Sequence, residues 1–151
     1  MTDAADYLGR RTVVVTPDAA GAAASLVAAL VAAGVEVHVV AGEQHARASG
    51  VASWNSCDFG SVEALDGALA RIGAVVQHVF QCEPTLGVFE AVAAAARPLM
   101  PVGGSIVAVD APDTRVDEFV RAHEGEFAAE RIRLVAAGVV DALEAGAPGL
   151  A

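Results

Sequence analysis

The chain has 151 residues, of which 55% are hydrophobic, and a formal net charge of -10 from 19 acidic and 9 basic residues. This length suits one domain, since most domains contain about 100 to 150 residues. The acidic balance disfavours nucleic acid as a partner, because a phosphate backbone requires clustered lysine and arginine. No uninterrupted apolar run reaches the roughly 18 to 20 residues that span a bilayer, so we expect no membrane segment.

The elements predicted in chain order are short β-branched runs that alternate with alanine-rich helical segments. The first strand, 12–16, is followed by a helix over 19–33, which Gly34 caps, and by a strand over 35–40. Strand, helix and strand within about 30 residues form the right-handed crossover of a parallel sheet. The further predicted elements are a strand at 51–57, a helix capped by Asp58 or Ser61 that ends at Ala70, a strand at 75–81, a helix at 85–99, a strand at 105–109, a helix at 113–130 and a strand at 132–135.

This alternation predicts an α/β fold with a Rossmann-like, doubly wound parallel sheet of about six strands in three α/β/α layers. We expect a single domain over residues 1–151, with flexible tails at 1–10 and 145–151. In open sheets of this kind, ligands bind outside the carboxyl ends of the strands. Residues at those ends are therefore the first candidates for a functional site.

The amino terminus and the cysteines give further expectations. Residues 1–7 are acidic and lack the basic start and apolar core of a secretory signal, so we expect a cytoplasmic protein. Cys57 and Cys82 have neither the spacing of a zinc site nor the density of a disulfide framework. We expect both to be small buried hydrophobic residues, and we expect no metal site.

Several stretches, in order, resemble the short-chain dehydrogenase/reductase family. Thr16 and Gly21 fall where the glycine-rich cofactor loop of the family begins and continues, and Asp58 resembles its aspartate near the adenine ring. The segment 86–100, followed by Gly-Gly-Ser-Ile-Val at 103–107, is similar to the family's interface helix and to the strand that leads to its catalytic serine. The resemblance covers nearly the whole chain and implies a nucleotide-binding fold with a vestigial cofactor site at these three residues.

The departures from the family's pattern concern cofactor binding and catalysis. The loop keeps only Gly21, Pro17 removes an N–H donor, and the second strand ends at Ala41 in place of a ribose-binding residue. The family's proton transfer needs a tyrosine and a lysine four residues later, but the only tyrosine here is Tyr7 and the chain has no lysine. We therefore expect no cofactor, with NAD or NADP disfavoured but left open.

Other residues are candidates for a replacement chemistry. Asp110 ends the fifth predicted strand, at the position of the family's serine, and His123 on the next helix could approach it. The pair would serve a non-redox acid/base step such as isomerisation, cyclisation or dehydration. The structural alternative is that Asp110 caps a turn and His123 lies on a solvated helix face. We interpret His38 and His78 as sheet residues with one hydrogen bond each, and Trp54 as a core or interface residue.

The predicted helix between Thr85 and Met100 suggests a partner. Its small residues Ala91, Ala94 and Ala95 permit close approach of another helix, and the matching helix of the family builds the dimer interface. The resemblance therefore implies a homo-oligomer, or a hetero-oligomer with an intact dehydrogenase. Our leading hypothesis is a pseudoenzyme subunit that pairs in this way without hydride transfer. The alternative is a non-redox enzyme at Asp110, and a working NAD(P)-dependent oxidoreductase is ranked last.

Overall fold

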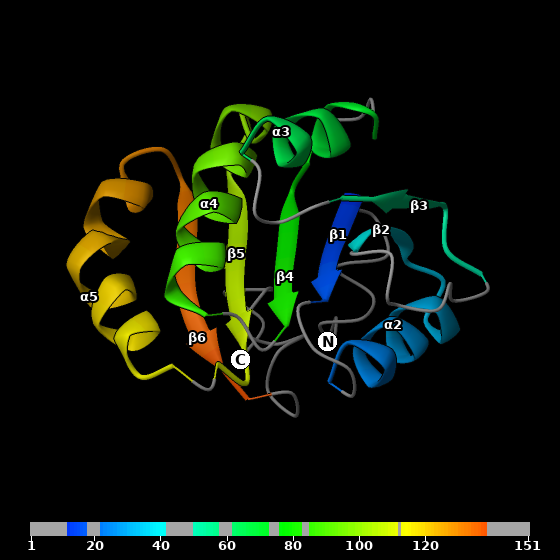
Figure 1. Cartoon of the computed structure of the whole chain (residues 1–151), viewed down its shortest axis with the longest axis horizontal. Coiled ribbons are helices and arrows are strands. Elements are labelled where there is room, and N and C mark those ends of the chain that lie inside the picture. The colour runs from blue at the N-terminus through cyan, green and yellow to red at the C-terminus, as the bar shows by residue number, and fades with distance from the viewer. Residues whose placement is uncertain are drawn as a thin grey trace, which may run out of the picture.

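The computed structural model of the chain describes residues 12–17, 22–41, 50–57, 62–72, 76–82, 85–111 and 113–138. Strands and helices alternate along these ranges, as the sequence predicts (Figure 1). In chain order the elements are β1 (Thr12–Pro17), α2 (Ala22–Ala32), β2 (Glu36–Ala41), β3 (Ser53–Ser56), α3 (Val62–Ala70), β4 (His78–Cys82), α4 (Leu86–Ala96), the 3₁₀ turn η1 (Arg97–Leu99), β5 (Gly104–Val109), α5 (Arg115–Ala128) and β6 (Ile132–Ala137).

The strands form one six-stranded sheet in the order β3-β2-β1-β4-β5-β6, and every neighbouring pair is parallel. The chain runs outward from β1 to β3, returns to place β4 beside β1, and then runs outward again to β6. The carboxyl ends of β1 and β4 therefore flank the point where the strand order reverses. This topology confirms the predicted Rossmann-like, doubly wound fold.

Two hydrophobic cores cover the two faces of the sheet. On one face, α3, α4 and α5 pack over side chains that include Val14, Val79 and Ile106. On the opposite face, α2 contributes Leu26, Val27 and Leu30 to a core with the alternate strand residues, such as Val15 and Phe80. Figure 1 shows α3, α4 and α5 on the same face of the sheet. The β-branched strands are buried on both sides because helices cover both faces.

Local sequence signals account for the element ends. Gly34 has φ 80° and ends α2 with the expected cap, in which Val35 N donates to Leu30 O and Gly34 N donates to Val31 O. The helix predicted at 85–99 ends as an α-helix at Ala96 and continues as η1, because Pro98 has no N–H to continue the α-helical hydrogen bonds. The strand predicted at 51–57 is shorter, and the last strand extends to Ala137.

The described ranges also include the two cysteines and the tryptophan. Cys57 and Cys82 are free and buried, as predicted. Trp54 packs against the core on the α2 face of the sheet. No described helix is long and apolar enough to cross a membrane. The tails predicted at 1–10 and 145–151 lie outside the described residues.

The start of β5 depends on a glycine. Gly104 has φ 141°, and a Cβ added there would lie 1.6 Å from the backbone oxygen of Gln77. We predict that Gly104→Ala abolishes cooperative folding or lowers stability severely, because backbone atoms of β4 cannot move aside. Gly125 in α5 has nothing within 4 Å of such a Cβ, so Gly125→Ala should raise the free energy of unfolding by about 1 kcal/mol. Urea unfolding followed by circular dichroism measures the stability of both variants. Equal stabilities of Gly104→Ala and Gly125→Ala would show that the start of β5 does not require a glycine.

Candidate functional site

The switch point of the sheet is marked by two buried polar side chains. Thr16 on β1 and Gln81 on β4 are neighbours in the parallel register, and both are fully buried. Gln81 Nε2 donates to the backbone oxygen of Thr16 at 3.1 Å, which fixes the orientation of the amide. Thr16 Oγ1 and Gln81 Oε1 have no hydrogen-bond partner in the described part of the chain.

These two atoms make the end of β1 and β4 chemically distinct from the apolar strands around it. A buried polar atom without a partner costs about 1–3 kcal/mol, which a hydrogen-bonding group placed there would recover. The hydroxyl can donate or accept, and the amide oxygen can only accept. The two side chains therefore form a polar position inside the core at the switch point of the sheet.

A second site lies beside it, at the carboxyl ends of β5 and β6. Asp110 directly follows β5 in a left-handed conformation, with φ 50°, and its N–H donates to Ala137 O at 2.9 Å. A cavity of about 300 Å³ is lined by Ala108, Asp110, Ala111, Asp117, Ala136, Ala137 and Gly138. Its other lining residues are alanines and a glycine, most of its exposed lining is polar, and its charged groups are two carboxylates. The prediction from strand position thus places Asp110 in a hollow at the ligand-binding edge.

His123 does not line that cavity. Its ring lies 4.4 Å from the Phe119 ring, measured between centroids, and its Nδ1 lies 3.3 Å from Glu126 Oε2. Asp117, which does line the cavity, is six residues earlier and so points about 120° away around the helix. The structure therefore gives Asp110 and His123 different surroundings, and Asp117 is the residue of α5 that shares the hollow with Asp110.

Side chains tie α4 and α5 together at both ends. At their amino ends, Asp113 Oδ2 accepts from Leu86 N at 3.2 Å, while Oδ1 accepts from Arg115 N at 3.0 Å. Thr85, at the N-cap of α4, makes no side-chain cap, so Asp113 supplies that function from another segment. The Arg115 guanidinium, with these backbone donors, holds the pKa of Asp113 well below its usual range.

The other ends are joined by Arg97. Its guanidinium donates to Glu126 at 2.9 Å and to Glu130, and it lies 4.5 Å from the centre of the Phe127 ring. The same contacts lower the pKa of both glutamates from the ordinary value. Hydrogen bonds and a cation–π contact together fix the relative position of the two helices. The sequence alone did not point to this cluster, because its members lie about 30 residues apart.

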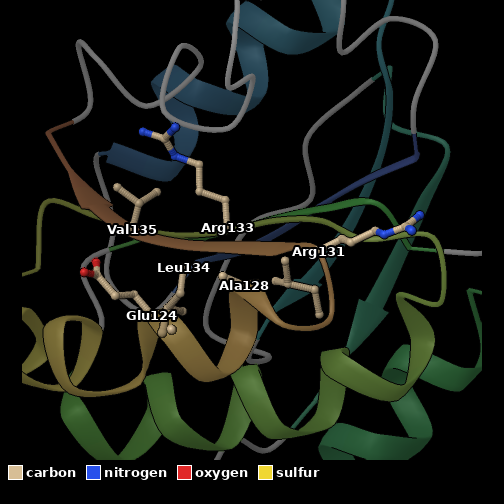
Figure 2. A pocket seen from close by; sticks show the side chains of 8 residues that line it. Glu124, Ala128, Arg131, Arg133, Leu134 and Val135 are labelled. Carbon is tan, nitrogen blue, oxygen red and sulfur yellow. The ribbon is translucent and has the colours of Figure 1, made fainter.

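A larger, shallower cavity of about 550 Å³ lies along α5 and the edge strand β6, lined by Glu124, Gly125, Ala128, Arg131, Ile132, Arg133, Leu134 and Val135. Figure 2 shows Arg133 and Val135 on one side of β6 and Leu134 on the side of α5. Arg131 has φ 65° and is exposed, as is Arg133. This hollow follows the first half of β6, away from the carboxyl edge that carries Asp110.

The remaining predicted residues fall into two groups. Gly21 and Asp58, assigned to the vestigial cofactor site with Thr16, lie outside the described residues. The two strand histidines form cross-strand pairs: His78 Nδ1 lies 2.7 Å from Ser105 Oγ, and His38 Nδ1 lies 2.7 Å from Ser53 Oγ. His38 exceeds the prediction of one hydrogen bond. Among the described residues, no cluster of three or more acidic, histidine or cysteine side chains could hold a metal ion.

Comparison with solved structures identifies the fold. The chain is similar to a short-chain type dehydrogenase/reductase from Mycobacterium ulcerans, with 19% identity and TM-score 0.66 over 85% of this chain and 67% of that one. It is also similar to a short chain oxidoreductase from Pseudomonas aeruginosa PAO1 that contains an atypical catalytic center, with 15% identity and TM-score 0.70 over 85% and 69% of the two chains. The enoyl-acyl carrier protein reductase of Bacillus cereus matches with 17% identity and TM-score 0.65 over 83% and 70%.

These likenesses establish the class of structure: the chain has the fold of the short-chain dehydrogenases and oxidoreductases. No family model matches the sequence, and no curated protein matches it.

The ionised form of Asp113 stabilises the α4–α5 pair, which predicts an acid-sensitive stability. Because its folded pKa is lowered, this contribution is present above the unfolded value of about 4 and is lost as pH falls below it. We predict that Asp113→Asn is less stable than wild type at pH 7 and that the two unfolding curves converge toward about pH 2. Asp66→Asn, on the exposed side of α3, is the control, and its difference in unfolding free energy from wild type should not change over the same pH range. If the difference in unfolding free energy between wild type and Asp113→Asn stayed constant from pH 7 to about pH 2, ionised Asp113 would not be what stabilises the α4–α5 pair.

Proposed function

We propose that this chain is a subunit with the short-chain dehydrogenase fold that does not transfer hydride and that pairs, through α4, with a second copy or with an intact dehydrogenase. The observation that carries the proposal is the missing proton-transfer pair: the chain contains no lysine, and its one tyrosine, Tyr7, precedes β1. A carbonyl reduction needs an acid at the substrate oxygen, and in the family a tyrosine with a lowered pKa supplies it. No other phenol or amine side chain is present to replace it.

The strand ends support the same proposal for the cofactor. An acidic or basic side chain after the second strand usually contacts the adenosine ribose or its phosphate. Here β2 ends at Ala41, whose side chain is fully buried in the core on the α2 face. Pro17 ends β1 and offers no N–H to a phosphate. Both strand ends thus support the proposal that the chain does not bind NAD or NADP in the family's manner.

The pairing surface is the outer side of α4. Gly87, Glu90 and Ala94 are exposed along it, and Ala91 and Ala95 are partly buried beside them. A second helix can approach closely over such small side chains, because little volume separates the two backbones. Asp113 and Arg97 hold α4 against α5, so the surface is ordered before any partner binds. A preordered surface loses less conformational entropy on association.

The mass of the chain in solution tests this pairing. We predict a mass of at least twice that of one chain, and a shift to the monomer for Ala94→Arg, because an arginine there blocks close helix approach. Ala29→Arg, on an exposed position of α2 at the opposite face, is the matched control and should keep the oligomer. If wild type is monomeric, the same variants are compared for co-purification with a co-expressed intact dehydrogenase. Insensitivity of both assays to Ala94→Arg would refute pairing through α4.

A second candidate function is supported by the cavity at Asp110. Two carboxylates in one small hollow suit general acid/base chemistry, such as proton abstraction beside a carbonyl group. We place Asp110 as the base in this candidate, with Asp117 as its neighbour. The same sheet edge holds the reactive groups of many α/β enzymes.

Solvent exchange measures such chemistry without knowledge of the natural substrate. The enzyme candidate predicts that the chain accelerates deuterium exchange at the carbons beside the carbonyl of cyclohexanone, followed by NMR. Asp110→Asn should lower that rate by about 100-fold. Asparagine tolerates the left-handed backbone of Asp110, so the fold should persist. Unchanged exchange in Asp110→Asn, or exchange at the buffer rate in wild type, would remove this candidate.

A further inference from the structure

A hydrogen-bonded serine, histidine and glutamate lie on β2 and β3, away from the carboxyl ends of β1, β4, β5 and β6. His38 and Ser53 are paired in the parallel register, at the third residue of β2 and the first of β3. The distance from Ser53 Oγ to His38 Nδ1 is 2.7 Å, and that from His38 Nε2 to Glu36 Oε2 is 3.1 Å. Both ring nitrogens of His38 are therefore engaged, one by a hydroxyl and the other by a carboxylate.

A fourth residue fixes the direction of these hydrogen bonds. Asn55 Nδ2 donates to Val39 O at 3.2 Å, which identifies it as the amide nitrogen, and it also donates to Ser53 Oγ at 3.0 Å. Since Ser53 Oγ accepts from Asn55, its own proton is free to point at His38 Nδ1. With neutral imidazole, Nδ1 then accepts and Nε2 carries the proton that is donated to Glu36.

The geometry points to a nucleophilic site in which Ser53 is the nucleophile, His38 its general base, and Glu36 and Asn55 positioning residues. The connectivity is that of a serine–histidine–acid triad, with the two ring nitrogens in exchanged roles. The side chain of His38 is 10% exposed and that of Glu36 55% exposed, and Ser53 is half-buried. The base is thus shielded by the protein while the serine remains accessible from solvent.

The reaction that this site supports is hydrolysis of a small ester. Ser53 Oγ forms a bond to the carbonyl carbon while its proton moves to His38 Nδ1. The bond from that carbon to the alcohol oxygen then breaks, and the alcohol leaves with the proton from His38. Water attacks the resulting acyl-serine, gives a proton to His38 and releases the acid, after which the proton returns to Ser53 Oγ. No oxidant, metal or cofactor enters this balance.

The position of the site indicates the substrate class. Ser53 lies on the edge strand β3 and is partly exposed, so a substrate can reach its hydroxyl from solvent. The chain carries a net charge of -10 and Glu36 is hydrogen-bonded to the proposed base His38, so the site disfavours anionic substrates. We therefore assign neutral esters with short acyl groups. This site is separate from Asp110 and from the outer surface of α4.

The chain contains its own comparison for this pair. His78 and Ser105 are also register partners on neighbouring parallel strands, and their Nδ1 to Oγ distance is likewise 2.7 Å. Both side chains are fully buried, so a substrate cannot reach them. The two pairs therefore have the same type of hydrogen bond but differ in solvent access. A comparison of Ser53 with Ser105 thus separates the effect of access on serine reactivity from that of the hydrogen bond.

A tagged alkyl fluorophosphonate is the first probe, because it bonds through phosphorus to an activated serine oxygen and releases fluoride. We expect peptide mapping of the labelled wild-type chain to find the tag on Ser53 and none on Ser105. Ser53→Ala should lose the label, and Ser56→Ala, an exposed serine on the same strand, should keep it. An unlabelled wild-type chain, or labelling confined to other serines, would overturn the proposal.

Hydrolysis of p-nitrophenyl acetate is the second probe. Because the chain has no lysine, no ε-amine contributes to the background rate. We expect His38→Gln to lower kcat by about 100-fold, and Glu36→Gln to lower kcat with KM unchanged, since Glu36 acts through His38. Glu36→Asp should restore part of the rate. Equal kcat in wild type and His38→Gln would overturn the proposal. Neither result depends on the oligomeric mass, so the two proposals fail independently.

Discussion

The parallel pairing of β1 with β4 is the interaction on which the rest of the structure depends. It joins the half of the sheet that runs outward to β3 with the half that runs outward to β6. Val14 and Val79 face one core, while Val15 and Phe80 face the other, so a shift of one residue would place each side chain on the wrong face. The same register sets Thr16 beside Gln81 at the switch point.

Local patterns in the sequence were sufficient to predict the fold. The β-branched runs, the alanine-rich segments and Gly34 each have a short-range physical meaning, and their order determines a parallel sheet. The candidate site was predictable only in part: strand position alone placed Asp110 at the carboxyl edge. The other polar features at this edge depend on contacts between distant segments. Only the structure could therefore identify Asp117, Gln81 and the hydrogen bond from Leu86 N to Asp113.

The two strand histidines show the same limit. Sequence predicts that a histidine inside a β-branched run makes a hydrogen bond, and it cannot say with which strand. The register pairs His38 and His78 with serines 15 and 27 residues away. Only the position of each strand in the sheet then distinguishes them: β3 is at the edge, whereas β4 and β5 are interior. The His38–Ser53 hydrogen bond is thus partly exposed to solvent, whereas the His78–Ser105 hydrogen bond is buried in the core.

We propose that the chain has the short-chain dehydrogenase fold and does not bind NAD or NADP. A calorimetric titration of the full chain with NADPH and with NADH tests it most directly. We predict no saturable heat for either nucleotide up to a concentration of about 1 mM, which corresponds to a binding free energy weaker than about 4 kcal/mol. Saturable binding with a Kd in the micromolar range would contradict it and would return hydride transfer to first place among the functions of this chain.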